Sequence, residues 1–198
     1  SHFGLEDIAI MRTIPNMNIT CPADCAELGK VLNDYAFNNR GPSYIRLTGV
    51  PGSDFLYEEN YKYKFGKIKS LFRGKDLLIL SYGSILGQIK LSINKIKKKY
   101  NLDIGVINVS TIKPIDNGLQ KIIKNYKKIL VIEEHTIIGG LGSIISELII
   151  KHNIKTNFSV ISLSDKFGPT GKYEYLLKIH GLDEKSITKK VLKLLKKK

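Results

Sequence analysis

Short, continuously apolar runs alternate along the chain with stretches in which apolar residues repeat at helical spacing. LLILSYG over 77–83 is typical of a buried strand, and isoleucines within 84–100 then recur every three or four residues, as on one helix face. The same alternation predicts strands over 103–110, 128–134 and 158–164, and helices over 113–126, 142–153, 172–181 and 183–197. This β-α-β-α-β-α-β order predicts an α/β fold with a mostly parallel, doubly wound sheet and helices on both faces.

The beginning of the chain follows a different order. It comprises a helix over 5–15 that stops at Pro15, a strand over 17–24, a helix over 24–39 with Asp24 at its N-cap, and a strand over 42–48. One β-α-β unit plus a helix is too little to enclose a core, and the stretch 49–66 is rich in turn and charged residues, as linkers are. We therefore predict a boundary near residue 60, between an incomplete unit over 1–60 and a complete α/β domain over 61–198.

The chain is strongly basic, with 32 Lys and Arg residues against 18 Asp and Glu residues and a formal net charge of +14. The lysines are scattered, with dense runs only over 95–100, 124–128 and 189–198, and no RNP, zinc-finger or helix-turn-helix pattern accompanies them. Although positive charge attracts nucleic acid, these patterns do not favour nucleic acid as a partner.

Cysteine usage favours a reducing compartment, and the hydropathy of the sequence does not indicate a membrane span. Cys21 and Cys25 lack the further Cys and His ligands of a zinc site, so we interpret both as buried or half-buried free thiols and predict no metal-binding residue. No apolar stretch reaches the roughly 18 residues that a membrane span needs, and no secretory signal opens the chain. We therefore expect a cytoplasmic protein without a membrane partner. The start at Ser1 suggests a piece of a longer protein.

The stretch EEHTIIGGLGS over 133–143 combines two carboxylates, a histidine and a glycine cluster at the end of a predicted parallel strand. Ligands often bind at this end of open α/β sheets, and glycines before a helix would expose backbone N–H groups to an anion. The spacing, however, is neither that of a P-loop nor that of a dinucleotide-binding fingerprint. Because glycines also allow close approach of helix and sheet, a tight turn is the favoured interpretation and an anion site the alternative.

Several ordered motifs resemble the transketolase family. The opening SHFGLEDIAIMRTIPNMNITCPAD is similar to a family signature in which a histidine precedes an EDxAxxRxxPN helix and a strand ending in PAD. GPSYIRL, STIKPID, VIEEHTIIGGLGSIISELI and SDKFGPTGKYEYLLKIHGLDEKSI follow in the family's order and spacing. The resemblance covers essentially the whole chain and is greatest to the separately encoded C-terminal subunit of some transketolases. Deoxyxylulose-phosphate synthase and the beta chain of 2-oxoacid dehydrogenases share the layout, but the ending of the chain favours transketolase.

This resemblance implies a part in an enzyme that transfers a two-carbon ketol unit between sugar phosphates, using thiamine diphosphate and magnesium. In the family, another domain or subunit holds the diphosphate and the metal, and a middle domain with an activating glutamate holds the aminopyrimidine ring. Residues 1–60 match only the last part of that middle domain, so the isolated chain is expected to bind neither cofactor and to be inactive. The expected partners are an N-terminal transketolase subunit or region, a sugar phosphate, and a second copy held through the C-terminal domain and the 135–143 turn.

Two residues are site candidates by this resemblance. His2 matches a histidine of the family's substrate channel and, in the intact enzyme, is predicted to bind substrate and to act in catalysis by exchanging protons. In the isolated chain, a frayed terminal histidine is the favoured interpretation. Arg46 is a candidate substrate ligand, with a structural ion pair as the alternative. Gly49 occupies the place of the family's phosphate-binding arginine, which leaves open whether the substrate is phosphorylated. The two carboxylates and the histidine of 133–135 are not expected to be catalytic.

Two other functions stay open. The C-terminal part of a 1-deoxy-D-xylulose-5-phosphate synthase would have a second arginine on the strand at 46–49, and Gly49 argues against this assignment. A non-catalytic assembly module would keep the interfaces of the family without its chemistry.

Overall fold

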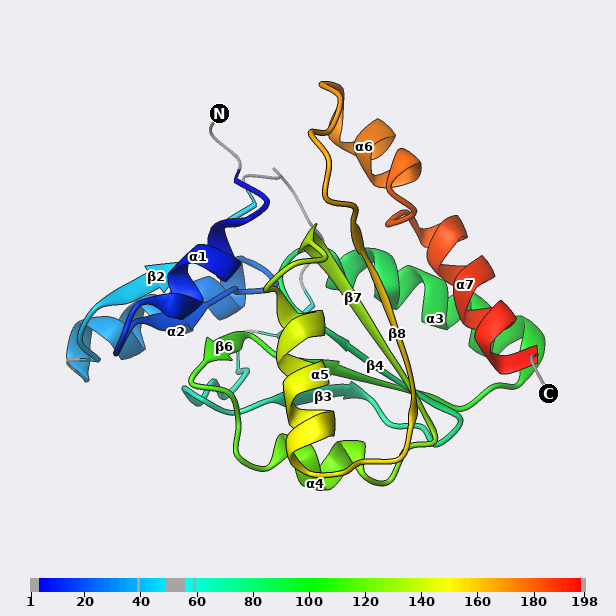
Figure 1. Cartoon of the computed structure of the whole chain (residues 1–198), viewed down its shortest axis with the longest axis horizontal. Helices are drawn as coiled ribbons and strands as arrows, with labels where there is room; N and C mark the ends of the chain where they lie inside the picture. Colours follow the sequence, from blue (N-terminus) through cyan, green and yellow to red (C-terminus); the bar gives the residue numbers. More distant parts are fainter. Residues whose placement is uncertain (1–3, 39, 49–55, 59, 197–198) are drawn as a thin grey trace.

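The computed structural model of the chain describes residues 4–38, 40–48, 56–58 and 60–196, which build two β-sheets with helices packed around them (Figure 1). The larger sheet has five strands in the order β3-β5-β4-β7-β8. Neighbouring strands are parallel except at the edge strand β3, which is antiparallel to β5. The strands are β3 (Lys69–Phe72), β4 (Leu77–Ser81), β5 (Ile104–Asn108), β7 (Lys128–Thr136) and β8 (Asn157–Leu163). The predicted α/β fold with a mostly parallel, doubly wound sheet is confirmed.

Helices cover both faces of this sheet, because strand residues alternate between two apolar layers. Leu77 and Ile79 of β4 belong to one core cluster, and Leu78 and Leu80 belong to the other. Since both faces are buried, the strand has no polar alternation and its sequence is a continuous apolar run. The first cluster is closed by α3 (Leu86–Tyr100), α6 (Tyr173–Ile179) and α7 (Glu184–Lys196), and the second by α4 (Leu119–Ile123) and α5 (Leu141–Lys151) (Figure 1).

The isoleucine repeat predicted for the helix after β4 is the buried face of α3. Ile89, Ile93 and Ile96 are fully buried against the sheet and α7. Burying an aliphatic side chain of this size contributes about 1.5–3 kcal/mol relative to leaving it in water. The buried hydroxyl of Ser92 on this helix is hydrogen-bonded to Thr188 of α7 at 2.8 Å, so it keeps a partner despite its burial.

The smaller sheet joins distant parts of the chain. Its middle strand β1 (Asn18–Thr20) is parallel to β2 (Ser43–Ile45), and α2 (Cys25–Phe37) connects the two. On its other side β1 is antiparallel to β6 (Thr111–Lys113), which follows β5 of the larger sheet. A strand from the second half of the chain therefore completes the sheet of the first.

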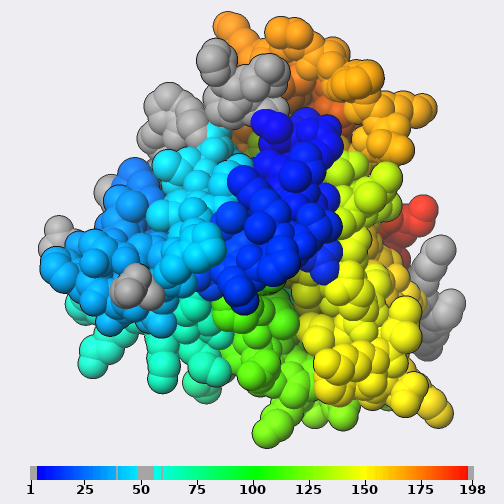
Figure 2. Space-filling view, turned by 60° about the vertical axis from the view of Figure 1, so that its left-hand side comes forward, coloured from blue at the N-terminus to red at the C-terminus, as the bar shows by residue number. Residues whose placement is uncertain are grey.

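The N-terminal elements share their core with the larger sheet. Ile8 of α1 (Asp7–Thr13) and Ile19 of β1 are fully buried in the same cluster as Leu78 and Leu80. Figure 2 shows the dark blue α1 between the lighter blue α2 and β2 on one side and the yellow α5 on the other. The boundary near residue 60 stays a prediction, and across it the two parts pack as one body of apolar side chains.

The prediction of a helix over 113–126 is wrong for most of this range, because only Leu119–Ile123 are helical, as α4. The residues before it pair with β1 as β6, which was not predicted. Asp116 then turns the chain, since its side chain accepts hydrogen bonds from the N–H groups of Gly118 (2.7 Å) and Ile68 (3.1 Å). The short edge strand β3 was also missed.

Asp24 is the N-cap of α2, as predicted. Its Oδ1 accepts a hydrogen bond from the Glu27 N–H at 2.8 Å, which satisfies a donor that the helix leaves free. Its Oδ2 accepts from the N–H groups of Leu56 (2.7 Å) and Tyr57 (3.0 Å). One carboxylate thus caps a helix and holds part of the stretch interpreted as a linker.

Both cysteines are free thiols. Cys21 is 1% exposed and lies in the core, and burial raises its pKa well above the ordinary value. Cys25, at the first position of α2, is exposed, so the expectation of a buried or half-buried thiol is wrong there. No helix within residues 4–38, 40–48, 56–58 and 60–196 has the length and apolar character that crossing a membrane requires.

Candidate functional site

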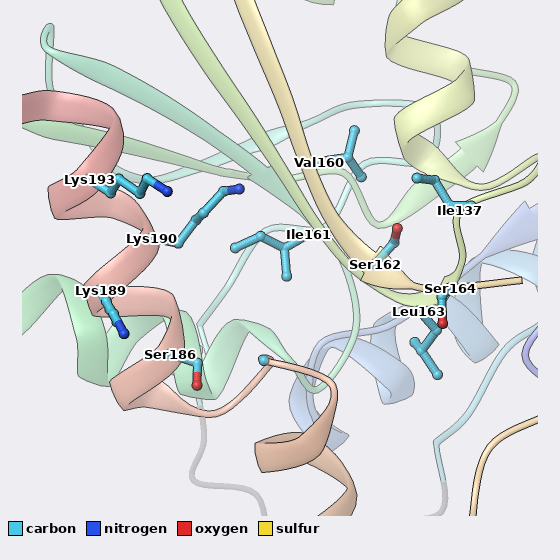
Figure 3. A pocket seen from close by; sticks show the side chains of 11 residues that line it. Ile137, Val160, Ile161, Ser162, Leu163, Ser164, Ser186, Lys189, Lys190 and Lys193 are labelled. Atoms are coloured by element: carbon cyan, nitrogen blue, oxygen red, sulfur yellow. The ribbon is translucent and has the colours of Figure 1, made fainter. Parts of the chain in front are cut away.

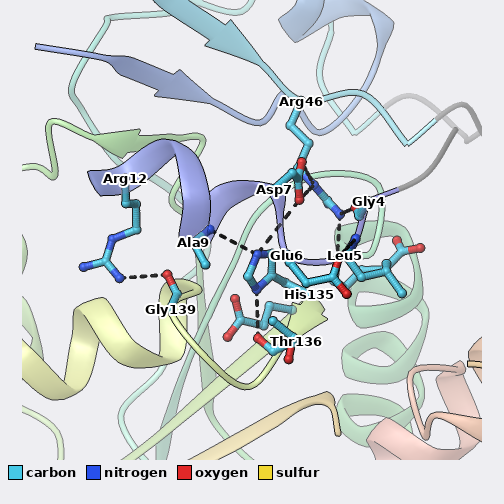
Figure 4. A network of polar contacts seen from close by, with 12 residues as sticks. Gly4, Leu5, Glu6, Asp7, Ala9, Arg12, Arg46, His135, Thr136 and Gly139 are labelled. Atoms are coloured by element: carbon cyan, nitrogen blue, oxygen red, sulfur yellow. Dashed lines mark hydrogen bonds and ion pairs between the residues drawn. The ribbon is translucent and has the colours of Figure 1, made fainter. Parts of the chain in front are cut away.

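At the carboxyl end of the parallel strands, α1 crosses the end of β7 and the turn that leads into α5 (Figure 4). The Thr136 N–H donates a hydrogen bond to the carbonyl of Leu5 at 2.8 Å, and the Ala9 N–H donates to Nε2 of His135 at 3.4 Å. Further side chains fasten α1 to its neighbours here. We use the name α1 latch for Asp7, Arg12, Arg46 and His135.

The centre of the α1 latch is an ion pair between Asp7, in the first turn of α1, and Arg46, which directly follows β2. Arg46 Nε lies 2.9 Å from Asp7 Oδ2 and 3.1 Å from Oδ1. Its Nη2 donates to the carbonyl of Glu134 at 3.0 Å, and the Tyr44 hydroxyl donates to Asp7 Oδ2 at 2.7 Å. The guanidinium therefore joins α1, β2 and the end of β7.

Arg46 is only 8% exposed, so its charge depends on these partners. Burial alone would lower the pKa of Arg46, but the acidic groups around it, Tyr82, Cys21 and Asp7 among them, raise it above the ordinary value. Removing one member of a buried ion pair typically costs about 3–5 kcal/mol, because the other charge is left without a partner. The geometry supports the structural ion pair as the role of Arg46, and substrate contact by Arg46 stays a prediction.

Arg12 extends the α1 latch to α5. Its Nη1 donates to the carbonyl of Gly139 at 2.7 Å, and its Nη2 lies 2.9 Å from both carboxylate oxygens of Glu147. The exposed pair with Glu147 contributes little by itself, whereas the bond to Gly139 ties α1 to the turn before α5.

His135 is fully buried and has a partner on each ring nitrogen. Nδ1 lies 2.8 Å from the carbonyl of Thr136, which can only accept, so Nδ1 carries the proton. Nε2 is then the acceptor for the Ala9 N–H, an arrangement that requires the neutral imidazole. Burial lowers the pKa of His135 from its ordinary 6.5, in agreement with a neutral ring. Asp7 Oδ1 lies 3.9 Å from Nε2, at the edge of ion-pair distance.

The carboxylate of Glu133 caps the N-terminus of α5. It is fully buried and accepts hydrogen bonds from the N–H groups of Leu141 (2.7 Å) and Gly142 (3.0 Å) and from the Tyr82 hydroxyl (3.2 Å). The first N–H groups of a helix have no partner within the helix, and negative charge is favourable beside them. Burial raises the pKa of Glu133, while these hydrogen bonds act in the opposite direction.

Because Glu133 occupies these N–H groups, an external anion does not fit at the start of α5. The anion-site alternative for 133–143 is therefore not supported. The turn interpretation is confirmed for 137–140, whereas 133–136 belong to β7. Glu134, the neighbouring carboxylate, accepts a hydrogen bond from the Tyr173 hydroxyl at 2.9 Å and so connects β7 with α6.

The two glycines of the turn are required by close packing. Gly139 has a φ of +78°, and a Cβ there would lie 2.5 Å from the Cβ of Ala9. A Cβ on Gly140 would overlap Oε2 of Glu133 and would lie 2.8 Å from Nδ1 of His135. The glycines therefore make room for α1 on one side and for the buried carboxylate on the other.

A second buried polar network surrounds Glu27 in the first turn of α2. The carboxylate accepts hydrogen bonds from the Ala23 N–H (2.8 Å), from Asn108 Nδ2 (3.0 Å) and from the Tyr61 hydroxyl (3.2 Å). Tyr57 stacks on Tyr61 with 3.9 Å between ring centroids, and its hydroxyl accepts from Asn108 Nδ2 at 2.8 Å. Burial raises the pKa of Glu27. This network joins α2, β5 and residues of the predicted linker.

Glu27 was missed in the sequence, although a signal was present. Asp24 followed three residues later by Glu27 is the spacing of a capping box, in which the glutamate turns back to a backbone N–H before the helix. Here the glutamate reaches the Ala23 N–H. By contrast, nothing local in the sequence pointed to the pairing of Glu134 with Tyr173.

His2 and Gly49 lie outside the described residues. Within the described part of the chain, no group of three or more His, Cys, Asp or Glu side chains could hold a metal ion. The buried carboxylates of Glu27 and Glu133 are occupied by donors of the chain itself, so, among the described residues, these two do not fit as ligands of thiamine diphosphate or magnesium. What the α1 latch can do is hold the segment that begins at Gly4 against the carboxyl end of the sheet.

Comparison with known proteins shows what the chain is similar to. Residues 66–187 match the family model "Transketolase, C-terminal domain". The chain is 37% identical to a protein of Methanocaldococcus jannaschii named as a transketolase C-terminal section, over 100% of the chain and 61% of that protein. It is 31% identical to a protein of Actinobacillus succinogenes named as one of the subunits of an apulose-4-phosphate transketolase, over 98% of the chain and 62% of that protein. The chain thus spans about three fifths of the length of these relatives.

Two further matches bear on fold and function. The chain is 31% identical to "1-deoxy-D-xylulose-5-phosphate synthase" of Clostridium perfringens, over 98% of the chain and 32% of that enzyme. Among solved structures, "Split gene transketolase, inactive beta4 tetramer" superimposes with a TM-score of 0.85 at 28% identity, over 98% of the chain and 63% of that chain.

We predict that Gly140→Ala destabilises the fold by about 2–4 kcal/mol, because the new methyl group displaces the Glu133 carboxylate from its donors. Urea unfolding of the two proteins, followed by circular dichroism, measures the difference. Gly29→Ala is the matched control, since Gly29 lies within α2 and a Cβ there would meet nothing within 4 Å beyond its chain neighbours and the backbone of its own helix. There alanine should stabilise the helix by about 0.5–1 kcal/mol. Equal midpoints for Gly140→Ala and the unchanged protein would contradict the close packing at this turn.

We predict that the chain loses stability below pH 6.5 relative to the His135→Gln variant. The pKa of His135 is lowered in the folded state, so the unfolded chain takes up the proton first and stability falls as the pH drops through 6.5. Glutamine does not titrate, so the difference between the two unfolding free energies isolates the contribution of His135, because contributions common to both proteins cancel to first order. The slope cannot exceed about 1.4 kcal/mol per pH unit, the limit for one proton. Parallel curves between pH 8 and pH 5.5 would show that His135 titrates normally.

Proposed function

The chain belongs to the transketolase family, and we propose that it forms the C-terminal part of an enzyme that transfers a two-carbon ketol unit between sugar phosphates. The observation that carries this proposal is the match of the whole chain to about three fifths of a transketolase C-terminal section. The proposal is compatible with the buried carboxylate of Glu133, which accepts hydrogen bonds from backbone N–H groups of the chain itself.

In this proposal, thiamine diphosphate and magnesium are held by parts of the enzyme that the chain does not supply. The cofactor, when bound there, provides the carbanion chemistry of ketol transfer. The α1 latch fixes the start of α1 through Asp7 and Arg46, and Arg46 also reaches the carbonyl of Gly4. The segment that contains His2 precedes this fixed point, which supports a role for His2 in binding the sugar and exchanging protons.

The proposed partner is an N-terminal transketolase subunit or region. The relatives named as a C-terminal section and as one of several subunits support this, because each name implies a complementary part. The substrate is proposed to be a sugar phosphate. Arg46 is engaged with Asp7, and Gly49 stands in the family's arginine position, so the phosphate ligand would come from another residue or from the partner.

We also propose that two copies associate beside the turn before α5. Ile10 of α1 and Ile138 of the turn are 63% and 56% exposed, and Gly139 brings these two elements into close contact. Apolar side chains gathered at a surface favour association. The solved relative described as a beta4 tetramer is consistent with self-association. Repulsion from the net charge of +14 opposes it, so added salt should tighten the contact.

A 1-deoxy-D-xylulose-5-phosphate synthase activity is the alternative enzyme, supported by the 31% identity to the enzyme of Clostridium perfringens. Assays of the assembled protein separate the two. Ketol transfer between sugar phosphates supports transketolase, and condensation of pyruvate with a triose phosphate supports the synthase. If the chain assembles with its partner but the assembly catalyses neither reaction, the result supports a non-catalytic assembly module.

We predict that the chain alone neither catalyses ketol transfer nor binds thiamine diphosphate with magnesium, and that the complementary N-terminal part restores activity. Calorimetric titration of the chain with cofactor should give no binding heat. A coupled assay of ketol transfer should show turnover only after mixing. Micromolar cofactor binding by the chain alone would contradict this assignment of roles.

In the assembled enzyme, we predict that His2→Ala lowers kcat/KM for the donor ketose by about 10²-fold, the lower end of the range for loss of a proton-transfer group. Cofactor affinity should be unchanged, as measured by calorimetry. His152→Ala is the control, since His152 is the C-cap of α5 at the end remote from the turn, and it should retain activity within about twofold. Full turnover by His2→Ala would remove His2 from the site.

A further inference from the structure

An open groove of about 490 Å³ runs along the outer edge of β8 (Figure 3). β8 is the edge strand of the larger sheet, and among the described residues no strand pairs with its outer side. Five consecutive residues, 160–164, line the groove along the strand. Ile137, from the turn before α5, forms one flank, and α7 forms the other through Lys189, Lys190 and Lys193.

The two flanks of the groove differ in chemistry because the side chains of β8 alternate between the two faces of the sheet. Ile161 packs against the core cluster that contains α7, whereas Val160 packs against the cluster that contains α5. On the α7 side the groove is bordered by ammonium groups, and on the α5 side by the apolar Val160 and by Ile137, which is 52% exposed.

The three lysines of this flank have no acidic partner within the described part of the chain. None of them forms a hydrogen bond or an ion pair with the described residues, whereas Lys95 on the adjacent α3 is paired with Glu184. Figure 3 shows Lys190 and Lys193 extending from α7 towards β8. Their positive charges are therefore directed along the open strand edge without being neutralised.

We propose that this groove binds an extended acidic peptide segment of a partner protein, which pairs with β8 as an additional strand. Main-chain hydrogen bonds to a free strand edge provide affinity, and alternate side chains provide specificity. A strand laid along β8 directs every second side chain towards α7, where carboxylates meet the three lysines. The intervening side chains face Ile137 and Val160, where apolar groups are favoured. The groove thus fits a sequence in which acidic and apolar residues alternate.

Charge decides against a second copy of this chain as the occupant. Pairing of two β8 strands about a two-fold axis would place both α7 helices on the same face, with their lysines approaching one another. The chain also carries +14 overall, so like charges would oppose such a contact. A small anion would contact the lysines but would leave Val160, Ile137 and the strand edge uncovered.

The test uses the 198-residue chain and the peptide acetyl-Glu-Val-Glu-Val-Glu-Val-Glu-amide, with binding measured by calorimetry at low salt and hydrogen exchange followed at residues 160–163. The groove variant is Lys189→Glu/Lys190→Glu/Lys193→Glu. The matched control is Lys121→Glu/Lys124→Glu/Lys127→Glu, which changes the net charge equally at exposed lysines around α4. Two further peptides carry N-methyl groups on one or the other set of alternate residues, so that one of them cannot pair with β8.

We expect binding by the unchanged chain and by the control variant, with about tenfold or greater weakening in the groove variant. One N-methylated peptide should bind at least about tenfold more weakly than the other, and exchange at 160–163 should slow when peptide is bound. Absence of binding overturns the proposal. Equal weakening in both lysine variants, or equal binding of both methylated peptides, reduces the effect to general charge attraction and also overturns it.

Two more results would reassign the groove. If tripolyphosphate binds as tightly as the peptide and displaces it, the groove is a site for small anions. If light scattering shows a dimer that the groove variant lacks and the control keeps, the occupant is a second copy. Either result overturns the proposal.

Discussion

The carboxylate of Glu133 at the start of α5 determines how α1 meets the turn between β7 and α5. A buried charge is costly unless donors surround it, and the first N–H groups of a helix are donors without partners. The Glu133 carboxylate and the first N–H groups of α5 therefore satisfy one another, and these hydrogen bonds restrict the conformation of the turn between β7 and α5. Gly140 is needed because a methyl group there would occupy the space of the carboxylate. Since Gly139 can be approached closely, α1 packs onto the turn, and the α1 latch forms on this support.

The N-terminal unit depends on the rest of the chain for both its sheet and its core. β1 has β2 on one side, but the strand on its other side, β6, comes from beyond β5. Ile8 and Ile19 are buried together with residues of β4. Buried ionic groups across this contact add directional constraints to the apolar packing, because each has few positions in which it keeps its partners. Such a contact is suited to holding the start of α1 in one place, and the proposed role of His2 relies on this.

The sequence predicts elements well where a single periodicity dominates. β4, α3 and β8 are strongly patterned, and they appear close to their predicted bounds. β3 and β6 have only a few residues each, and their pairing is decided by strands distant in the sequence, so no local pattern marks them. The same holds for the site. The N-cap at Asp24 is local and was predicted, whereas the pairing of Arg46 with Asp7 depends on the packing of α1 against β2. Motif order indicated the family, but it did not reveal that Glu133 closes the start of α5.

The two edges of the larger sheet are protected in different ways. β3 is short, antiparallel and interrupted by an irregularity between Ser70 and Phe72, features that discourage pairing with another strand. β8 has seven residues, is largely apolar at its centre, and lies parallel to β7 in regular register from Asn157 to Ile161. Its protection comes from the lysines of α7, which stand beside the strand and not on it. Charge placed in this way repels copies of the same basic chain but leaves the main-chain groups of the edge accessible. An edge protected by charge alone therefore discriminates among partners by the sign of their charge, which an edge blocked by proline or by a bulge could not do.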